Sequence, residues 1–279
     1  MRVEDCLVTV ERRSAGGCID LAFVFTRQFF VPIYRLMLLF AVPNCIIAWW
    51  LTSMATDMLI PNLILFSIFS ALFGGALVAA IGPQVFGVPI SIRAAVRGLR
   101  QHIFTYGLLM GVARVFQLLT SFCVILPSIL VTSWCGHIAE VVVLEKTPLP
   151  NVTSRLSWLA AGGGYGRNLS RVATLLVFWA LLSGGLLVLI DVLALMLFNV
   201  PIFLGQLSVA TPDTDRLLAS VFLDDPKVQL TICVALWLPY PIIRVAWFFC
   251  YLDQRIRNEC WDLDLQFRVE AIRLEEAGL

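Results

Sequence analysis

The sequence predicts an all-helical membrane protein that crosses the bilayer about six times. Of its 279 residues, 59% are hydrophobic and only 14% are charged, and the mean hydropathy is +0.88. This apolar content exceeds what one soluble core of that length needs. Six apolar stretches also come close to the roughly 20 residues with which a helix crosses about 30 Å of hydrocarbon.

The predicted spans are separated by polar loops or by proline. The third and fourth run together in the sequence, but Pro127 and Ser128 favour a tight hairpin that yields two spans of ordinary length. We expect one membrane domain over residues 1–279, ending in an amphipathic tail over residues 251–279. The predicted spans cover residues 36–55, 59–81, 103–124, 126–144, 172–197 and 229–250.

Positive charges are concentrated on one predicted side of the membrane. Lys and Arg number five in residues 1–35, three in 82–102, four in 145–171 and four in 251–279, against two in the loop 198–228. By the positive-inside rule, both termini are cytoplasmic, as an even number of spans also requires. The predicted location is the inner membrane of a bacterium.

Amphipathic segments come before the spans. Apolar and basic residues alternate at helical spacing around Leu21–Phe29 and Ile92–Leu99, which is typical of helices that lie in the headgroup region. The tail from Trp261 has a similar face, although Trp261–Phe267 would also suit a strand. Basic entry segments at Arg27, Arg100 and Arg167 suggest an interfacial helix plus hairpin used three times, unless every basic loop looks this way.

Several local patterns resemble a known family. They are Cys18-Ile-Asp-Leu-Ala-Phe-Val-Phe, the span ending Val142-Val-Leu-Glu145, Arg155-Leu-Ser-Trp158 and Tyr251-Leu-Asp-Gln-Arg-Ile-Arg257. Together they resemble bacterial membrane proteins related to the membrane domain of glycerophosphoryl diester phosphodiesterases. Leu156, between Arg155 and Ser157, and the glycine-rich run after Ala161 depart from that pattern. The resemblance implies the membrane architecture alone, and we expect the soluble catalytic barrel to be absent.

We single out four ionisable residues by their depth inside predicted spans: Arg114, His137, Glu140 and Arg244. A charge in hydrocarbon costs several kcal/mol unless it is paired or hydrated, so each is a candidate functional residue. Counting about 1.5 Å per residue places Glu140 and Arg244 at similar depth, where they could pair. Such a pair is either structural or part of a proton or ion relay.

No reaction centre can be assembled from the sequence. His137 and Glu140 share a helical face, but a metal site needs further ligands, and the only other histidine, His102, lies at a membrane boundary. The run Gly162–Gly166 fails both nucleotide fingerprints and predicts a flexible turn. We therefore expect no catalytic residue, cofactor or metal, and the eight scattered cysteines predict no disulfide framework.

Two features shape the predicted helices. Pro239 and Pro241 should break the sixth span and free the carbonyls of Ala235 and Trp237, as in transporter substrate paths or in an ordinary packing kink. Small residues recur at every fourth position of the second span and predict a packing surface, inside the chain or between subunits. They are Ser67, Ala71, Gly75 and Ala79.

Three functions remain open on this basis. The first is a non-enzymatic membrane subunit or scaffold for partner proteins, acting through a basic cytoplasmic face and the tail from Asp253. The second is a transporter or permease component that uses the charged residues within the spans and the proline break. The third, an intramembrane lipid enzyme, lacks an identifiable nucleophile. Expected partners are the bilayer, anionic headgroups at the cytoplasmic face, and other proteins or further copies of this chain, but not nucleic acid.

Overall fold

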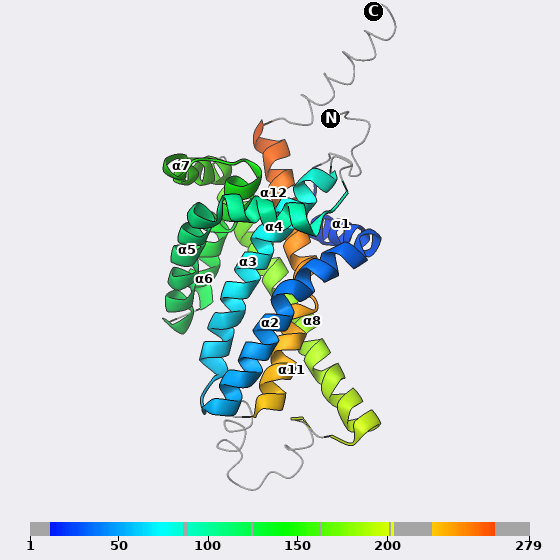
Figure 1. Ribbon diagram of the computed structural model, residues 1–279. Helices are drawn as coiled ribbons and strands as arrows, with labels where there is room; N and C mark the ends of the chain where they lie inside the picture. The colour runs from blue at the N-terminus through cyan, green and yellow to red at the C-terminus, as the bar shows by residue number, and fades with distance from the viewer. Residues whose placement is uncertain are drawn as a thin grey trace, which may run out of the picture. The chain divides into compact units, whose positions relative to one another are not determined.

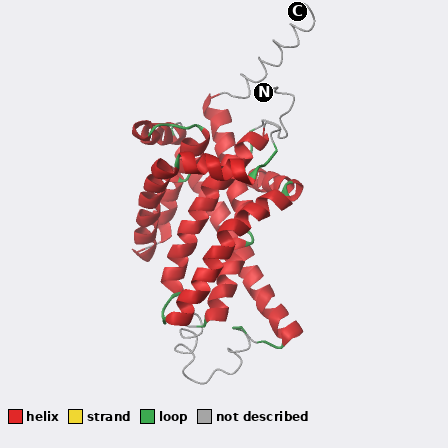
Figure 2. Cartoon of the chain, viewed as in Figure 1, coloured by secondary structure: helices red, strands yellow, loops and turns green. Residues whose placement is uncertain are grey.

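The computed structural model describes residues 12–85, 89–123, 125–161, 163–200, 202–203 and 225–259. Within these ranges the regular structure is helical and includes no strand (Figures 1 and 2). The prediction of an all-helical chain is thus confirmed. The ambiguous segment Trp261–Phe267 lies outside the described residues.

Six helical segments are long and apolar enough to cross a membrane, which confirms the predicted multi-pass architecture. In four of them one helix forms the span or most of it, whereas the fourth and sixth spans each consist of two segments. They are α2 (Phe30–Met54), α3 (Leu59–Val85), α5 (Ile103–Cys123), α6 (Ile125–Cys135) with η2 (Glu140–Leu144), α8 (Gly164–Phe198), and α11 (Pro226–Trp237) with α12 (Tyr240–Glu259).

Three amphipathic helices alternate with these spans. They are α1 (Ala15–Gln28), α4 (Ile92–Gln101) and α7 (Leu149–Ala160), and each comes directly before two spans in the chain. Ser14 and Ser91 cap α1 and α4 by accepting hydrogen bonds from backbone N–H groups of the first turn. The element order therefore has the threefold form that the sequence suggests.

One predicted turn is wrong. The sequence predicts a flexible glycine-rich turn over Gly162–Gly166, but α8 already begins at Gly164, well before the predicted start of the fifth span. The turn ends at Gly163, whose φ of 79° favours glycine because it has no Cβ. Glycine in a helix is tolerated when the helix continues into a long apolar span that stabilises it.

The chain forms two compact units. Unit 1 comprises Met1–Ile33, Gly74–Leu175 and Ile242–Leu279, and unit 2 comprises Tyr34–Phe73 and Leu176–Pro241. Helices α2, α3, α8 and α12 contribute residues to both units. All three amphipathic helices belong to unit 1.

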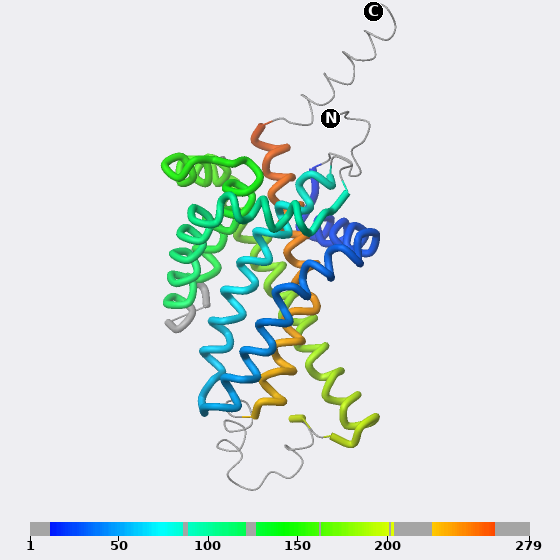
Figure 3. Tube along the Cα trace, viewed as in Figure 1, coloured from blue at the N-terminus to red at the C-terminus, as the bar shows by residue number. Residues whose placement is uncertain are grey.

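Unit 1 packs through an antiparallel hairpin and a close contact of small residues. Helices α5 and α6 lie side by side (Figure 3). A Cβ at Gly75 of α3 would lie only 2.8 Å from Leu99 Cδ1 of α4, and one at Gly98 would lie 3.4 Å from Ala79 Cβ. The predicted small-residue surface is thus used inside unit 1 at Gly75 and Ala79, because small side chains let these helices approach closely.

Unit 2 packs around aromatic rings. Phe66 stacks on Trp179 with centroids 5.9 Å apart and meets Trp237 edge to face at 5.3 Å. Phe73 and Tyr240 complete the cluster. Such rings bury large apolar areas, and their edge-to-face contacts add about 0.5–1.5 kcal/mol per pair.

Candidate functional site

The last part of the fourth span departs from α-helical geometry in unit 1. Helix α6 ends at Cys135, and Glu140–Leu144 forms the π-helix η2, in which the N–H of Glu145 donates to the carbonyl of Glu140 at 3.1 Å. Single π-helical turns are rare and occur often at functional sites. The first residue of this turn is Glu140, one of the predicted candidates.

Glu140 and Arg244 form a buried ion pair. Arg244 Nη2 lies 2.8 Å from Glu140 Oε1, and the two residues are 8% and 0% exposed. Gly74 provides the space, since a Cβ there would lie 3.0 Å from Arg244 Nε. The contact is ionic, because neither carboxylate oxygen of Glu140 meets hydrogen-bond geometry with a described donor. The pair that the two depths predict is therefore present.

His137 lies next to this pair and is held by an indole. Its ring stacks on Trp247 with centroids 4.3 Å apart, and its Nδ1 is 4.0 Å from Glu140 Oε2. Trp247 donates from Nε1 to the carbonyl of Gly136 at 2.9 Å. A Cβ at Gly136 would lie 2.6 Å from Trp247 Cζ2, so glycine allows this close approach. Neither ring nitrogen of His137 has a hydrogen-bond partner among the described residues.

The structure brings together three of the four predicted residues. Arg114 lies on α5, half-buried, and no ion pair joins it to a described carboxylate. Its buried Nε has no hydrogen-bond partner in the described part of the chain. We call His137, Glu140 and Arg244 the intramembrane cluster. Its combination of a paired charge and unbonded acceptors could hold a proton, a water molecule or a small cation, or it could serve packing alone.

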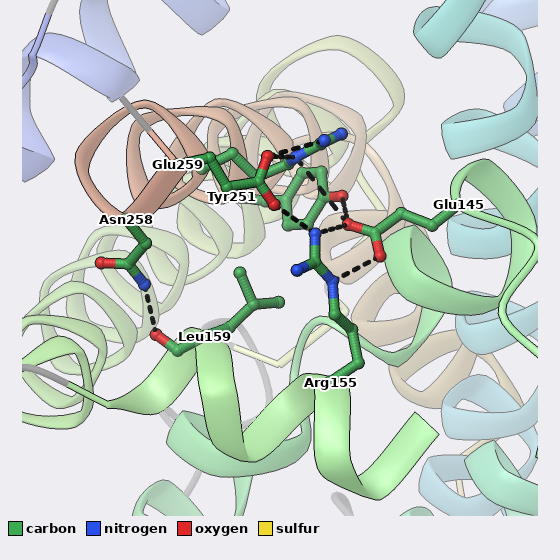
Figure 4. Close-up of polar contacts among 7 residues, drawn as sticks. Glu145, Arg155, Leu159, Tyr251, Asn258 and Glu259 are labelled. Carbon is green, nitrogen blue, oxygen red and sulfur yellow. Dashed lines mark hydrogen bonds and ion pairs between the residues drawn. The ribbon is translucent and has the colours of Figure 1, made fainter. Parts of the chain in front are cut away.

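A second group of charges, which the sequence did not point to, ties η2, α7 and α12 together (Figure 4). Arg155 donates from Nε to Glu145 Oε2 at 2.7 Å and from Nη2 to Oε1 at 2.9 Å, and it also pairs with Glu259. Tyr251 donates its hydroxyl to Glu145, and Arg255 pairs with Glu259 at 2.7 Å. We call these five residues the Glu145 network.

The Glu145 network sets the charge of its central groups. Burial by itself would raise the pKa of Glu145, but the hydrogen bonds from Arg155 and Tyr251 and the nearby positive charges outweigh burial and lower it. The hydrogen bond to Glu145 raises the pKa of Arg155 despite partial burial. Arg155 also lies 4.7 Å from the ring centroid of Trp158, in cation–π range. Glu145 is therefore a firmly ionised carboxylate that binds α7.

A third group of charges surrounds Asp253 on α12. Asp253 pairs with Arg171 of α8 and, at 2.8 Å, with Arg257, and it accepts from the N–H of Arg13 at 2.6 Å. Arg171 also donates to the carbonyl of Cys250 at 3.1 Å. The first part of the predicted tail, residues 251–259, is thus the end of α12. The remaining residues, 260–279, lie outside the described ones.

The interruption of the sixth span lies in unit 2. Helix α11 ends at Trp237 and α12 begins at Tyr240, with Pro241 in its first turn. Hydrogen bonds from other helices reach the carbonyls beside those predicted. Trp179 donates to Leu236 at 3.2 Å and Tyr34 donates to Leu238 at 3.0 Å. Side chains of unit 2 thus compensate the backbone where the helix is broken.

Asp191 is a buried acid that the sequence interpretation did not single out. It lies within the predicted fifth span, is 1% exposed, and accepts from the backbone N–H groups of Ile202 at 3.2 Å and Phe203 at 3.1 Å. Its position in an apolar run of the sequence could have identified it as a candidate.

The pairing of Arg171 with Asp253 could not be identified from local sequence, because 82 residues separate them.

Across the described residues, no three His, Cys, Asp or Glu side chains come together as a metal site. Comparison with protein families, curated proteins and solved structures found no match to this chain. The resemblance to the membrane domain of glycerophosphoryl diester phosphodiesterases stays a prediction from the sequence. Function must therefore be argued from the residues themselves.

Proposed function

We propose that this protein is a non-enzymatic membrane subunit that holds partner proteins or further copies of itself at the cytoplasmic face of a bacterial inner membrane. One observation carries the proposal. Every buried or half-buried carboxylate described in unit 1 is held by at least one arginine: Glu140 by Arg244, Glu145 and Glu259 by Arg155, and Asp253 by Arg171. Acids engaged in this way serve architecture and leave no ready general base.

The same contacts build a firm platform. The Glu145 network joins η2, α7 and α12, and the contacts of Asp253 join α8, α12 and the segment before α1. Bidentate arginine–carboxylate contacts restrict geometry more than single hydrogen bonds do. A subunit that positions partners benefits from such rigidity, whereas a transporter needs elements that move.

The first test is affinity purification of the tagged chain in gentle detergent, with mass spectrometry of co-purifying proteins and native mass determination. A stoichiometric partner or a defined homo-oligomer supports the proposal. A matched pair of variants makes this test more specific. Arg155→Gln should loosen α7 and reduce partner recovery, whereas Arg27→Gln, an exposed side chain of α1, should leave recovery unchanged. A lone monomer that moves a solute across vesicles would contradict the proposal.

Transport is the second candidate, favoured by the intramembrane cluster. Glu140 and His137 are fully buried and keep unbonded polar atoms beside a π-helical turn, a combination that can bind a transported proton or cation. Proteoliposomes containing the wild type would then show a flux that Glu140→Gln abolishes while the native mass stays the same. Absence of flux for protons and monovalent cations would remove this candidate.

A further inference from the structure

Three arginines of α4 form an exposed group on one face of the helix. Arg93, Arg97 and Arg100 are spaced by four and three residues, so they share one helical face, and all three are exposed. None makes an ion pair or hydrogen bond through its side chain with a described residue, whereas Arg155 and Arg171 are engaged by carboxylates. The sequence contains no Asp or Glu between Asp57 and Glu140, so this positive face has no compensating acid nearby in the chain.

The opposite face of α4 fixes the helix in place. Ala95 and Leu99 are buried, and Gly98 meets α3 at Ala79. Leu99 packs closely on Gly75, so this face of α4 is held against α3. Packing therefore holds the arginine face outward. Binding of a ligand to this face requires no rearrangement of the backbone.

Exposed apolar residues follow these arginines in the chain, as a stripe on α5. Exposed residues follow Arg100 at steps of three or four, beginning with Phe104, which is 90% exposed. Helix α4 ends at Gln101 with His102 as its C-cap, so the apolar residues lie on the next helix. The apolar members of the stripe are Phe104, Leu108, Val112, Val115 and Leu119.

We propose that the arginine face of α4 and the beginning of the α5 stripe bind an anionic phospholipid, with the phosphate at Arg93, Arg97 and Arg100 and an acyl chain along Phe104 and Leu108. Guanidinium groups bind phosphate oxygens in a bidentate manner, and an exposed apolar stripe directly after them fits a ligand that is anionic at one end and apolar at the other. An acidic protein or a soluble phosphate would leave the α5 stripe unused. This lipid site does not depend on whether the protein is a scaffold.

The test is native mass spectrometry of the full chain titrated with phosphatidylglycerol or with phosphatidylcholine of the same acyl chains. Each arginine near an anionic surface strengthens binding by about fivefold, so Arg93→Gln with Arg97→Gln should weaken phosphatidylglycerol binding by about 25-fold. The matched control removes two other exposed arginines, Arg27→Gln with Arg35→Gln, and should weaken it by no more than about threefold. Phe104→Ser should also weaken the lipid without altering charge.

Four outcomes would overturn the proposal. They are equal affinity of the wild type for the two lipids, equal losses in the test and control pairs, full displacement of lipid by glycerol 3-phosphate, and occupation of α4 by a co-purified acidic protein in place of lipid. The first and third need only the wild-type chain, so they remain decisive if a variant fails to fold. Preference for phosphatidylglycerol that declines with added salt supports the site.

Discussion

Unit 1 and unit 2 satisfy their buried polar side chains with different kinds of contact. Both place polar side chains where water is excluded, but unit 1 satisfies its acids with arginines, as at Glu140 and Asp253. In unit 2 the described polar contacts are largely neutral. Asn44 Oδ1 accepts from Trp237 Nε1 at 2.7 Å, and Asn62 Nδ2 donates to Gln229 Oε1 at 3.1 Å.

The exception in unit 2 supports the distinction. Asp191 is buried like Glu140, yet its carboxylate accepts two backbone N–H groups in the described part of the chain. Apart from Asp191, the hydrogen bonds named in unit 2 join neutral groups, and these avoid most of the desolvation penalty that an ion pair in a low dielectric must overcome. Unit 1 should therefore respond to changes of charge and pH, whereas unit 2 should respond to the loss of shape or of single hydrogen bonds.

The largest expected effect is at the intramembrane cluster. Glu140→Ala leaves the Arg244 guanidinium buried without its partner and should lower the free energy of unfolding by about 3–5 kcal/mol. Adding Arg244→Ala should recover part of this loss, because the unpaired charge is then removed. The measurement is a double-mutant cycle of unfolding in mixed micelles. Strictly additive losses would mean that the two side chains do not interact.

The next effect belongs to unit 2. Asn44→Ala leaves the indole N–H of Trp237 buried without an acceptor and should cost about 1–3 kcal/mol, equally at pH 5 and pH 8. Trp237→Phe in the same background removes the orphaned donor and should cost less than it does in the wild type. A cost of Asn44→Ala that changes with pH would contradict the neutral chemistry assigned to unit 2.

The Glu145 network should make unit 1 sensitive to acid, by about 1 kcal/mol because its groups are partly exposed. The pKa of Glu145 is lowered in the folded protein, so its pairing stabilises the fold above the ordinary carboxyl pKa and is lost as pH falls through the lowered value. Thermal unfolding of the wild type and Glu145→Gln should therefore differ at pH 7, and the difference should shrink as the pH falls below about 4. A difference that persists unchanged in acid would refute the role of Glu145.

Two thiols provide a direct test of packing in unit 2, with no expected loss of stability. Cys45 Sγ and Cys233 Sγ lie 3.3 Å apart, and both cysteines are free. A mild oxidant should join them without destabilising the fold, since only a small movement brings the sulfurs to bonding distance. Peptide mapping should find a linkage between residues 45 and 233 in the wild type, and Cys45→Ser should abolish it. No linkage under conditions that oxidise exposed thiols would argue against this contact of α2 with α11.

Particular elements separate what a sequence can predict from what it cannot. The hairpin near Pro127 was predicted within a few residues, because a proline and two apolar runs are local signals. The start of α8 at Gly164 was not, because glycine propensity favours a turn and the packing of a long helix overrides it. His137 was found as a candidate, but its stacking on Trp247 depends on two elements that are distant in the chain.

By itself, the sequence determined that the chain is helical, that it crosses a membrane about six times, and that amphipathic helices come before the spans. The free energies of transfer of the residues from water to hydrocarbon add nearly independently. Their sum over a stretch of sequence is therefore enough to identify the spans. The tertiary structure confirmed the pair of Glu140 with Arg244, which similar depth had made possible, and it alone decided that Glu145 meets Arg155 and Asp253 meets Arg171. Many pairings of twenty basic with nineteen acidic residues are compatible with the same hydropathy, and helix packing selects among them.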